Sequence, residues 1–104
     1  MSETTPTRRP DFLGHREGDS VVVAVRDLVP GLVTGGYLAG HATVEVELRD
    51  SIPLGHKFAL VDIAQGAGVV EYGVRIGVAS HSIARGEYVH VHNLSSARWQ
   101  NSIG

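Results

Sequence analysis

The sequence contains no cysteine, and this absence removes several classes of protein at once. Disulfide-stapled domains, metal sites built from thiolates and enzymes with a cysteine nucleophile all depend on that side chain. Lysine is nearly absent as well, because Lys57 is the single lysine among nine basic residues. Eleven acidic residues balance these nine, so the net charge of −2 offers no basic surface of the kind that binds nucleic acid.

Long apolar runs are also missing. The longest stretch without Asp, Glu, Lys or Arg spans residues 28–44, and it contains His41, Pro30 and several glycines. A membrane-spanning helix needs about 20 consecutive apolar residues, so we expect no contact with a membrane. The first 20 residues lack the apolar segment of a secretory signal. We therefore expect a cytoplasmic protein with one modest hydrophobic core.

A helical period is absent too, whereas valine and glycine are abundant. The chain has 15 valines and 13 glycines, and no window of 12 residues keeps an amphipathic helical pattern. Valine favours strands because its branched Cβ is stiff in a helix, and glycine favours tight turns. The composition predicts an all-β domain with short strands. We expect these strands at residues 20–25, 42–48, 57–61, 69–72, 74–79 and 87–92, and a loop or irregular hairpin at 29–40.

Three five-residue segments repeat one pattern, at residues 27–31, 62–66 and 82–86. Each begins with Asp or Ser, continues with a large aliphatic residue and ends with Gly. Such a segment can form a single helical turn, capped by its first side chain and terminated by its glycine. Three ordinary turns with similar chemistry explain the pattern equally well, and the sequence leaves both interpretations open.

Two histidines, His90 and His92, occupy alternate positions in the last predicted strand. On a strand, such residues share a face, with Cα atoms about 6.6 Å apart. Two imidazoles at that spacing can converge on one divalent metal, and iron, zinc or manganese all accept such ligands. Asn93 could add an oxygen donor or a hydrogen bond. The alternative is that Val89 and Val91 face the core while both histidines face water.

A second candidate lies where Gly55, His56 and Lys57 open the strand expected at 57–61. Pro53 and Gly55 form a turn, which places the histidine and the lysine at a loop edge. A lysine beside a histidine suits the binding of a carboxylate or another anion. Beside a second cation, or away from water, Lys57 could also act as a base. The alternative is an exposed lysine at the end of a strand.

These motifs resemble the SAF domain of the altronate/galactarate dehydratase family. The resemblance is carried by Arg26-Asp27-Leu28, by residues 47–57 ending in Gly55-His56-Lys57, by residues 59–66 and 83–87, and by Val89-His90-Val91-His92-Asn93-Leu94. It covers about residues 19–95. It implies a β-clip fold similar to type III antifreeze proteins. The polar composition of residues 1–18 separately predicts a flexible arm, in which Phe12 and Leu13 could still pack on the domain, and residues 96–104 form a polar tail that contains Trp99.

The resemblance implies a lyase that removes a β-leaving group from a hydroxy acid such as altronate, galactarate or sulfolactate. The chain would be a small subunit that completes the active site of a separate large catalytic subunit. Substrate-binding candidates are then Gly55, His56, Lys57 and Asn93, while the residues that perform catalysis stay unassigned. A divalent metal shared with the large subunit, iron or manganese with zinc as the alternative, would be held by His90 and His92.

A different class of function stays open beside this one. The chain could be a non-catalytic SAF module that binds a sugar acid or an assembly partner. The Gly-His-Lys turn and the histidines of residues 90–92 favour the lyase, because a purely structural module has no need of them. The sequence also leaves self-association open.

Overall fold

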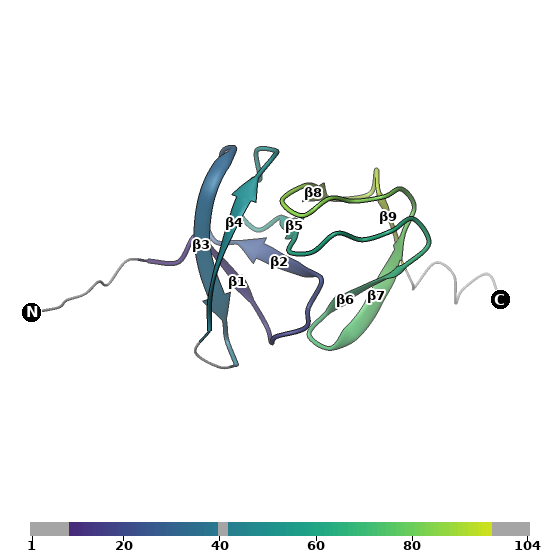
Figure 1. The fold of residues 1–104 in the computed structure, drawn as a ribbon, viewed down its shortest axis with the longest axis horizontal. Helices are drawn as coiled ribbons and strands as arrows, with labels where there is room; N and C mark the ends of the chain where they lie inside the picture. Colours follow the sequence, from purple (N-terminus) through teal and green to yellow (C-terminus); the bar gives the residue numbers. More distant parts are fainter. Residues whose placement is uncertain (1–8, 40–41, 97–104) are drawn as a thin grey trace, which may run out of the picture.

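The computed structural model describes residues 9–39 and 42–96, and over these residues the chain forms strands and no helix (Figure 1). The strands are β1 (Phe12–Gly14), β2 (Val21–Ala24), β3 (Gly31–Tyr37), β4 (Thr43–Leu48), β5 (Lys57–Ala59), β6 (Gly68–Glu71), β7 (Val74–Ala79), β8 (Tyr88–Val89) and β9 (Leu94–Ser96). The all-β prediction is confirmed. In the described part of the chain, no helix is long and apolar enough to span a membrane.

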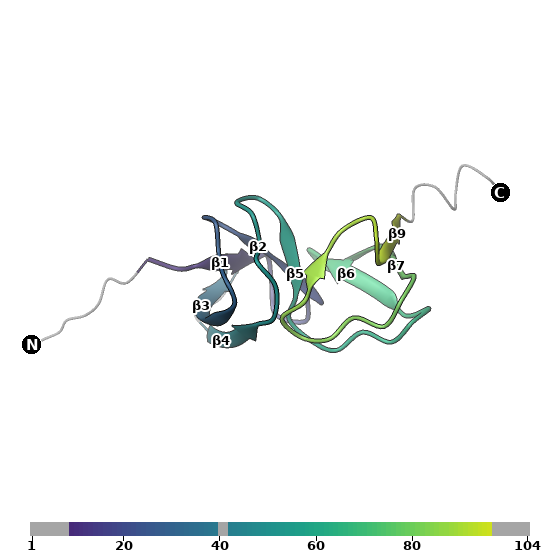
Figure 2. The same cartoon turned by 90° about the horizontal axis from the view of Figure 1, so that it is seen from above.

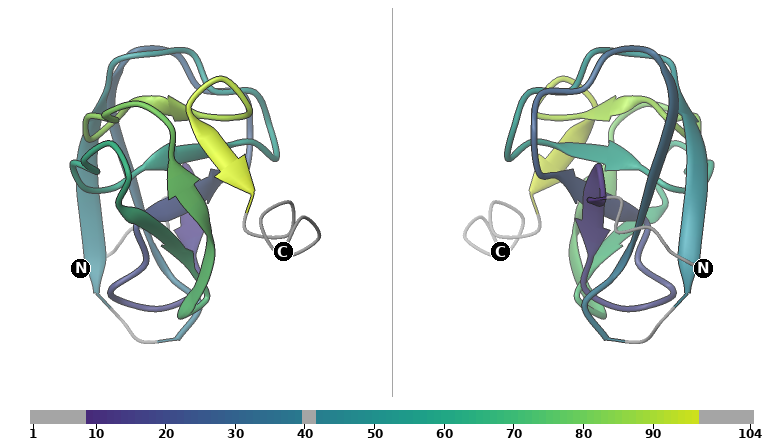
Figure 3. Two further views of the ribbon diagram at one scale, coloured as in Figure 1. Left: turned by 90° about the vertical axis from the view of Figure 1, so that its right-hand side faces the viewer. Right: turned by 90° about the vertical axis from the view of Figure 1, so that its left-hand side faces the viewer.

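The strands form two sheets. The larger sheet has the order β4-β3-β1-β2-β5-β8, and the smaller has the order β6-β7-β9. Figures 1 and 2 show β3 and β4 at one end of the molecule, β6, β7 and β9 at the other, and β2 and β5 between them. Viewed along the long axis, the strands curl around the interior instead of lying in flat layers (Figure 3). This curled all-β architecture is that of a SAF β-clip.

Each end of the molecule has its own hydrophobic core. In the first core the rings of Phe12 and Phe58 meet edge to face, with centroids 5.1 Å apart. The second core is built from aliphatic side chains such as Val69 and Ile83. Ser20 joins the two regions, because its backbone N–H donates to the Val70 carbonyl at 2.8 Å. The cavity described below lies where β5 and β8 run between these cores.

The repeated turn segments form two related bridges. Leu28 pairs with Ile52 and Ile63 pairs with Ile83, in both cases as an isolated antiparallel bridge. All four side chains are buried. The same type of bridge thus occurs once in the first half of the domain and once in the second.

An aspartate precedes the first residue of each bridge, and its side chain fixes the turn that follows the second residue of that bridge. Asp27 Oδ1 accepts a hydrogen bond from Leu54 N at 2.8 Å, and Asp62 Oδ1 accepts one from Arg85 N, also at 2.8 Å. The single helical turns suggested by the sequence are not formed in the described residues. The aspartates satisfy backbone groups more than twenty residues away, so they cannot cap a helix of their own segment.

The glycine-rich segment that we expected to form a loop or irregular hairpin contains the long strand β3. β3 pairs with β4 over six positions and with β1 in parallel. Gly35 makes the second pairing possible, because a Cβ at this position would lie 2.3 Å from the Phe12 carbonyl oxygen. Glycine at this position allows two backbones to approach closely. Composition alone did not distinguish a glycine needed for close approach from a glycine needed for a turn.

Part of the expected arm at residues 1–18 belongs to the ordered domain, as the sequence left open for Phe12 and Leu13. Phe12 is 1% exposed and lies in β1, which pairs with both β2 and β3. Burial of this ring stabilises β1, and the carboxylate of Asp11 accepts a hydrogen bond from Thr34 N at 2.9 Å. The tail assignment at 96–104 also starts within a strand, since β9 includes Ser96. Trp99 lies outside the described residues.

Asp19 connects the segment between β1 and β2 to the turn between β6 and β7. Its carboxylate accepts four backbone N–H bonds, from His15 (3.3 Å), Arg16 (3.4 Å), Tyr72 (2.9 Å) and Gly73 (3.1 Å). Burial by itself raises the pKa of Asp19, but the four donors together outweigh burial and hold the pKa below its ordinary value of 3.8. The ionised form of Asp19 therefore stabilises the folded state.

This linkage predicts a pH-dependent cost for the substitution Asp19→Asn. Near neutral pH we expect a loss of about 2 kcal/mol, because an amide cannot accept all four bonds. The contribution of Asp19 is fully present above pH 3.8 and is lost as the pH falls through its lowered pKa. The difference in the free energy of unfolding between the variant and the parent should therefore disappear in acid. Urea denaturation at several pH values measures this difference.

Asp62→Asn is the matched control for this prediction. Asp62 is exposed and accepts one backbone bond, from Arg85, so we expect a cost below about 1 kcal/mol. A difference for Asp19→Asn that is the same at pH 7 and in acid would contradict the role assigned to the ionised carboxylate.

Candidate functional site

A tight turn places the Gly-His-Lys motif at the start of β5. Gly55 has a φ of 83°, in the left-handed region that side chains rarely adopt. His56 N donates to the Pro53 carbonyl at 3.0 Å, and the His56 carbonyl accepts from Ala24 N at 2.9 Å. His56 is thus fixed by backbone hydrogen bonds immediately before β5, with Lys57 as the first residue of the strand.

The segment with His90 turns instead of continuing as a strand. β8 ends at Val89, and the His90 carbonyl accepts from both Asn93 N and Leu94 N at 3.0 Å. The Asn93 side chain closes this turn, since Oδ1 accepts from His90 N at 3.0 Å and Nδ2 donates to the Tyr88 carbonyl at 2.8 Å. The predicted strand through residue 92 was therefore wrong beyond Val89, because Asn93 satisfies the backbone groups that a longer strand would pair.

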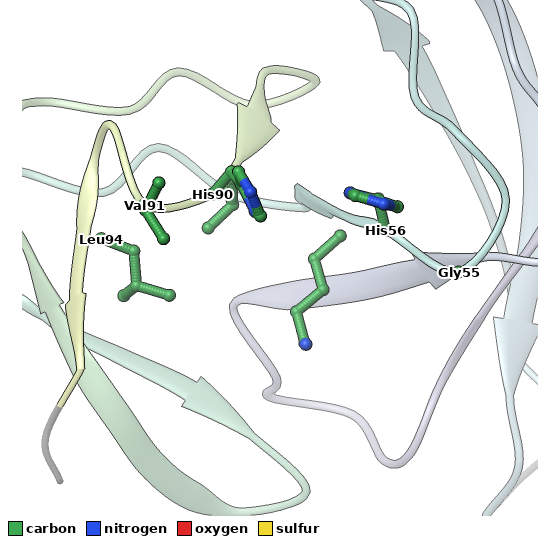
Figure 4. A pocket seen from close by; sticks show the side chains of 7 residues that line it. Gly55, His56, His90, Val91 and Leu94 are labelled. Atoms are coloured by element: carbon green, nitrogen blue, oxygen red, sulfur yellow. The ribbon is translucent and has the colours of Figure 1, made fainter.

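A cavity of about 290 Å³ lies between these two segments, and we call it the anion cavity after the ligand that we propose for it below. Figure 4 shows Gly55 and His56 on one side of it and His90, Val91 and Leu94 on the other. Its lining residues are Gly55, His56, Lys57, Val89, His90, Val91 and Leu94. The structure thus brings together both motifs that the sequence singled out, although they are separated by more than thirty residues.

The two imidazoles that approach each other are not the pair that we expected. The rings of His56 and His90 have centroids 5.5 Å apart and line the same cavity. His92 and Asn93 instead line a second cavity, which Tyr88 also lines. The prediction that His90 and His92 share one face assumed a strand through both residues, and the turn after Val89 removes that geometry.

Tyr88 is a candidate functional residue that our sequence analysis missed. Its hydroxyl lies 2.5 Å from His56 Nδ1, and its ring stacks on His90 with centroids 5.5 Å apart and an angle of 3°. The His92 ring lies 5.9 Å away. The sequence did contain a signal for Tyr88, because Tyr88, His90 and His92 occupy alternate positions in the segment Tyr88-Val89-His90-Val91-His92.

Lys57 has an acidic neighbour that sequence spacing did not reveal. Its Nζ lies 3.7 Å from Glu71 Oε1, and the other oxygen of Glu71 lies 3.7 Å from His15 Nε2. The side chain of Lys57 is 36% exposed, so it remains accessible from solvent. Lys57 therefore stands beside an anion, not beside the second cation on which a role as a base depends. An incoming anion would compete with the Glu71 carboxylate for the Lys57 ammonium group.

The described residues alone do not provide a metal centre. They contain no group of three or more histidine, cysteine or acidic side chains that could hold a metal ion. Protein zinc sites use three or four protein ligands, whereas His90 and His92 are at most two and line different cavities. Asn93 is 6% exposed and its amide is bound to backbone groups. A metal at this site would need further ligands, from another chain or from residues outside those that the structure describes.

The curled all-β fold and a cavity lined by a Gly-His-Lys turn and a neighbouring histidine define the class as a SAF-type module with a polar site. Comparison with known families identifies the family to which this module belongs. Residues 10–97 match the altronate/galactarate dehydratase SAF domain, and the chain belongs to that family.

Relatives of known activity include both short and long proteins. The chain is 42% identical over 91 residues to (2R)-sulfolactate sulfo-lyase subunit alpha of Chromohalobacter salexigens, covering 86% of this chain and 97% of that one. It is 40% identical over 51 residues to the protein of the same name from Paracoccus pantotrophus, covering 49% of this chain and 76% of that one. Altronate dehydratase of Escherichia coli is 47% identical over 75 residues, which are 72% of this chain but 14% of that enzyme.

Proposed function

We propose that this chain is the small SAF-domain subunit of a two-component lyase that acts on a 2-hydroxy acid, with sulfolactate as the first candidate substrate. The observation that carries the proposal is the anion cavity, found on a chain whose match spans 97% of a sulfolactate lyase alpha subunit. The name of that relative, subunit alpha, describes one subunit of a larger enzyme. We propose that a large subunit covers the cavity of this chain and supplies the remaining catalytic groups.

The chemistry of such a lyase explains why a cationic cavity is useful. A base removes the proton on C2, the electron pair moves toward the carboxylate, and the C3–S bond then breaks to release sulfite. The enol that remains becomes a 2-keto acid. Negative charge accumulates on the carboxylate oxygens during this step, so a fixed cation and N–H donors near those oxygens lower the barrier.

Residues of this chain can hold the substrate in such a reaction. We assign Lys57 to the carboxylate, as a charge-assisted hydrogen-bond donor, with the His56 and His90 rings on either side of the anion. Gly55 allows the backbone to approach the ligand closely because it has no side chain. Asn93 is assigned to holding the His90 turn. If a divalent metal is present, ligands from the large subunit must join His90 or His92.

Co-expression with candidate large subunits tests the proposal. Lyase activity would be assayed on sulfolactate, altronate and galactarate after co-purification of the two chains. We expect a stable complex and turnover of one substrate. A chain that binds a hydroxy acid without any catalytic partner would instead indicate the binding-module function.

We also expect the purified chain to show no measurable turnover by itself. Its cavity is open to solvent and is lined by one lysine and two histidines. A substrate there would stay in contact with water, and the site lacks the enclosure on which electrostatic stabilisation depends. The measurement is sulfite or keto-acid release by the chain with and without the large subunit. Robust turnover by the chain alone would place the catalytic machinery in the small subunit.

A further inference from the structure

We infer that Tyr88 is a positioning residue that holds the His56 imidazole in the tautomer with its proton on Nε2. His56 then presents an N–H donor to the anion cavity. The consequence for catalysis rests on the proposed function, whereas the tautomer itself follows from the geometry of this chain.

The hydrogen bond between the two residues sets the tautomer. The Tyr88 hydroxyl lies 2.5 Å from His56 Nδ1. A phenol donates more readily than it accepts, and a neutral imidazole has one unprotonated nitrogen that accepts, so we assign the proton of the bond to Tyr88. A neutral imidazole that accepts at Nδ1 carries its own proton on Nε2. Nε2 is then the ring nitrogen available to a ligand in the cavity that His56 lines.

Tyr88 is itself held from several directions, as a positioning residue must be. Its backbone N–H donates to Asp50 Oδ2 at 2.9 Å, and its carbonyl accepts from Asn93 Nδ2 at 2.8 Å. Its position in β8 is paired with Phe58 of β5, next in sequence to Lys57. The stacked His90 ring restricts the phenol further. The hydroxyl is therefore aimed at His56 by fixed backbone and ring contacts.

Nitrogen NMR of the isotopically labelled full chain tests this assignment without a partner or a substrate. Under mildly alkaline conditions we expect His56 Nδ1 to resonate as an unprotonated, hydrogen-bonded nitrogen and Nε2 as a protonated one. Tyr88→Phe should remove the hydrogen-bond shift at Nδ1 and allow the second tautomer to be populated. A His56 proton on Nδ1, or His56 signals unaffected by Tyr88→Phe, would overturn the inference.

Tyr72→Phe is the matched control. Tyr72 also lies against a histidine, with its ring centroid 4.6 Å from that of His15, but it is 59% exposed and remote in sequence from the cavity. Removal of its hydroxyl should leave the His56 signals unchanged. A change of equal size in this variant would show that the effect of Tyr88→Phe is not local, and would overturn the inference as well.

The reconstituted complex supplies the second readout. With a large subunit present, Tyr88→Phe should lower kcat on the order of tenfold, because a donor is misoriented in the transition state, while KM changes less since Lys57 still binds the carboxylate. An unchanged kcat would overturn the catalytic part of the inference. A parent complex without lyase activity would contradict the proposed function, and the tautomer would still be decided by NMR.

Discussion

Replacing Lys57 with methionine is expected to lower kcat/KM of the reconstituted complex about 100-fold, through both KM and kcat. The substitution keeps most of the length of the side chain and removes its charge, so the substrate carboxylate loses a charge-assisted bond worth about 1.5–3 kcal/mol. The carboxylate is charged in the ground state and gains further charge in the transition state, so the loss should raise KM and also lower kcat. Steady-state kinetics on the substrate identified for the complex measures both constants.

The stability of the Lys57→Met variant should change little. The ion pair that is lost, with Glu71, is long at 3.7 Å and partly exposed, and such pairs contribute at most about 1 kcal/mol. Arg75→Met removes an exposed cation of β7 that does not line the anion cavity, and it should leave the kinetics unchanged. Activity of Lys57→Met within threefold of the parent would show that Lys57 does not contact the substrate.

Replacing Gly86 with alanine is expected to destabilise the fold by more than about 4 kcal/mol. Gly86 has a φ of 88°, and a Cβ there would lie 2.2 Å from the Glu47 carbonyl oxygen. The backbone cannot move aside easily, because Gly86 N donates to Ala59 O at 2.8 Å and Gly86 O accepts from Arg49 N at 3.0 Å. Backbone strain and a steric clash add together, and a loss of this size is a large part of the stability of a small domain.

The related turn provides the comparison. Gly66 has a φ of 86°, but no atom lies within 4 Å of the position that a Cβ would take. Gly66→Ala therefore adds backbone strain alone, about 1–2 kcal/mol. Chemical denaturation of both variants separates the two effects. Equal losses for Gly66→Ala and Gly86→Ala would mean that contact with the backbone at Glu47 is not important for stability.

Several features of the fold followed from local chemistry and could be predicted from the sequence. The strand predicted at 74–79 is β7, and the alternation of Val44, Val46 and Leu48 with polar residues correctly placed β4 with one face buried. The turn glycines Gly55, Gly66 and Gly86 all adopt positive φ. These features depend on a residue and its near neighbours, which is why composition and spacing were sufficient.

The same is true of the two motifs that line the anion cavity. Gly-His-Lys and the histidines after β8 were chosen because their chemistry stands out in a chain with one lysine and no cysteine. The structure places His56, Lys57 and His90 around one cavity. Their roles toward a substrate remain predictions, which the variants proposed above examine.

Tertiary structure alone decided how these residues are paired. Glycine-rich β3 became a strand because β1 and β4 flank it, and no local preference of its glycines favours that outcome. Tyr88 reaches His56 across 32 residues because β8 pairs with β5, and Glu71 reaches Lys57 from the other sheet. Sequence spacing describes neighbours along the chain, whereas hydrogen bonds and ion pairs form between neighbours in space. The sequence thus determined the strand class, the turns and the reactive side chains, and long-range strand pairing decided which of them meet.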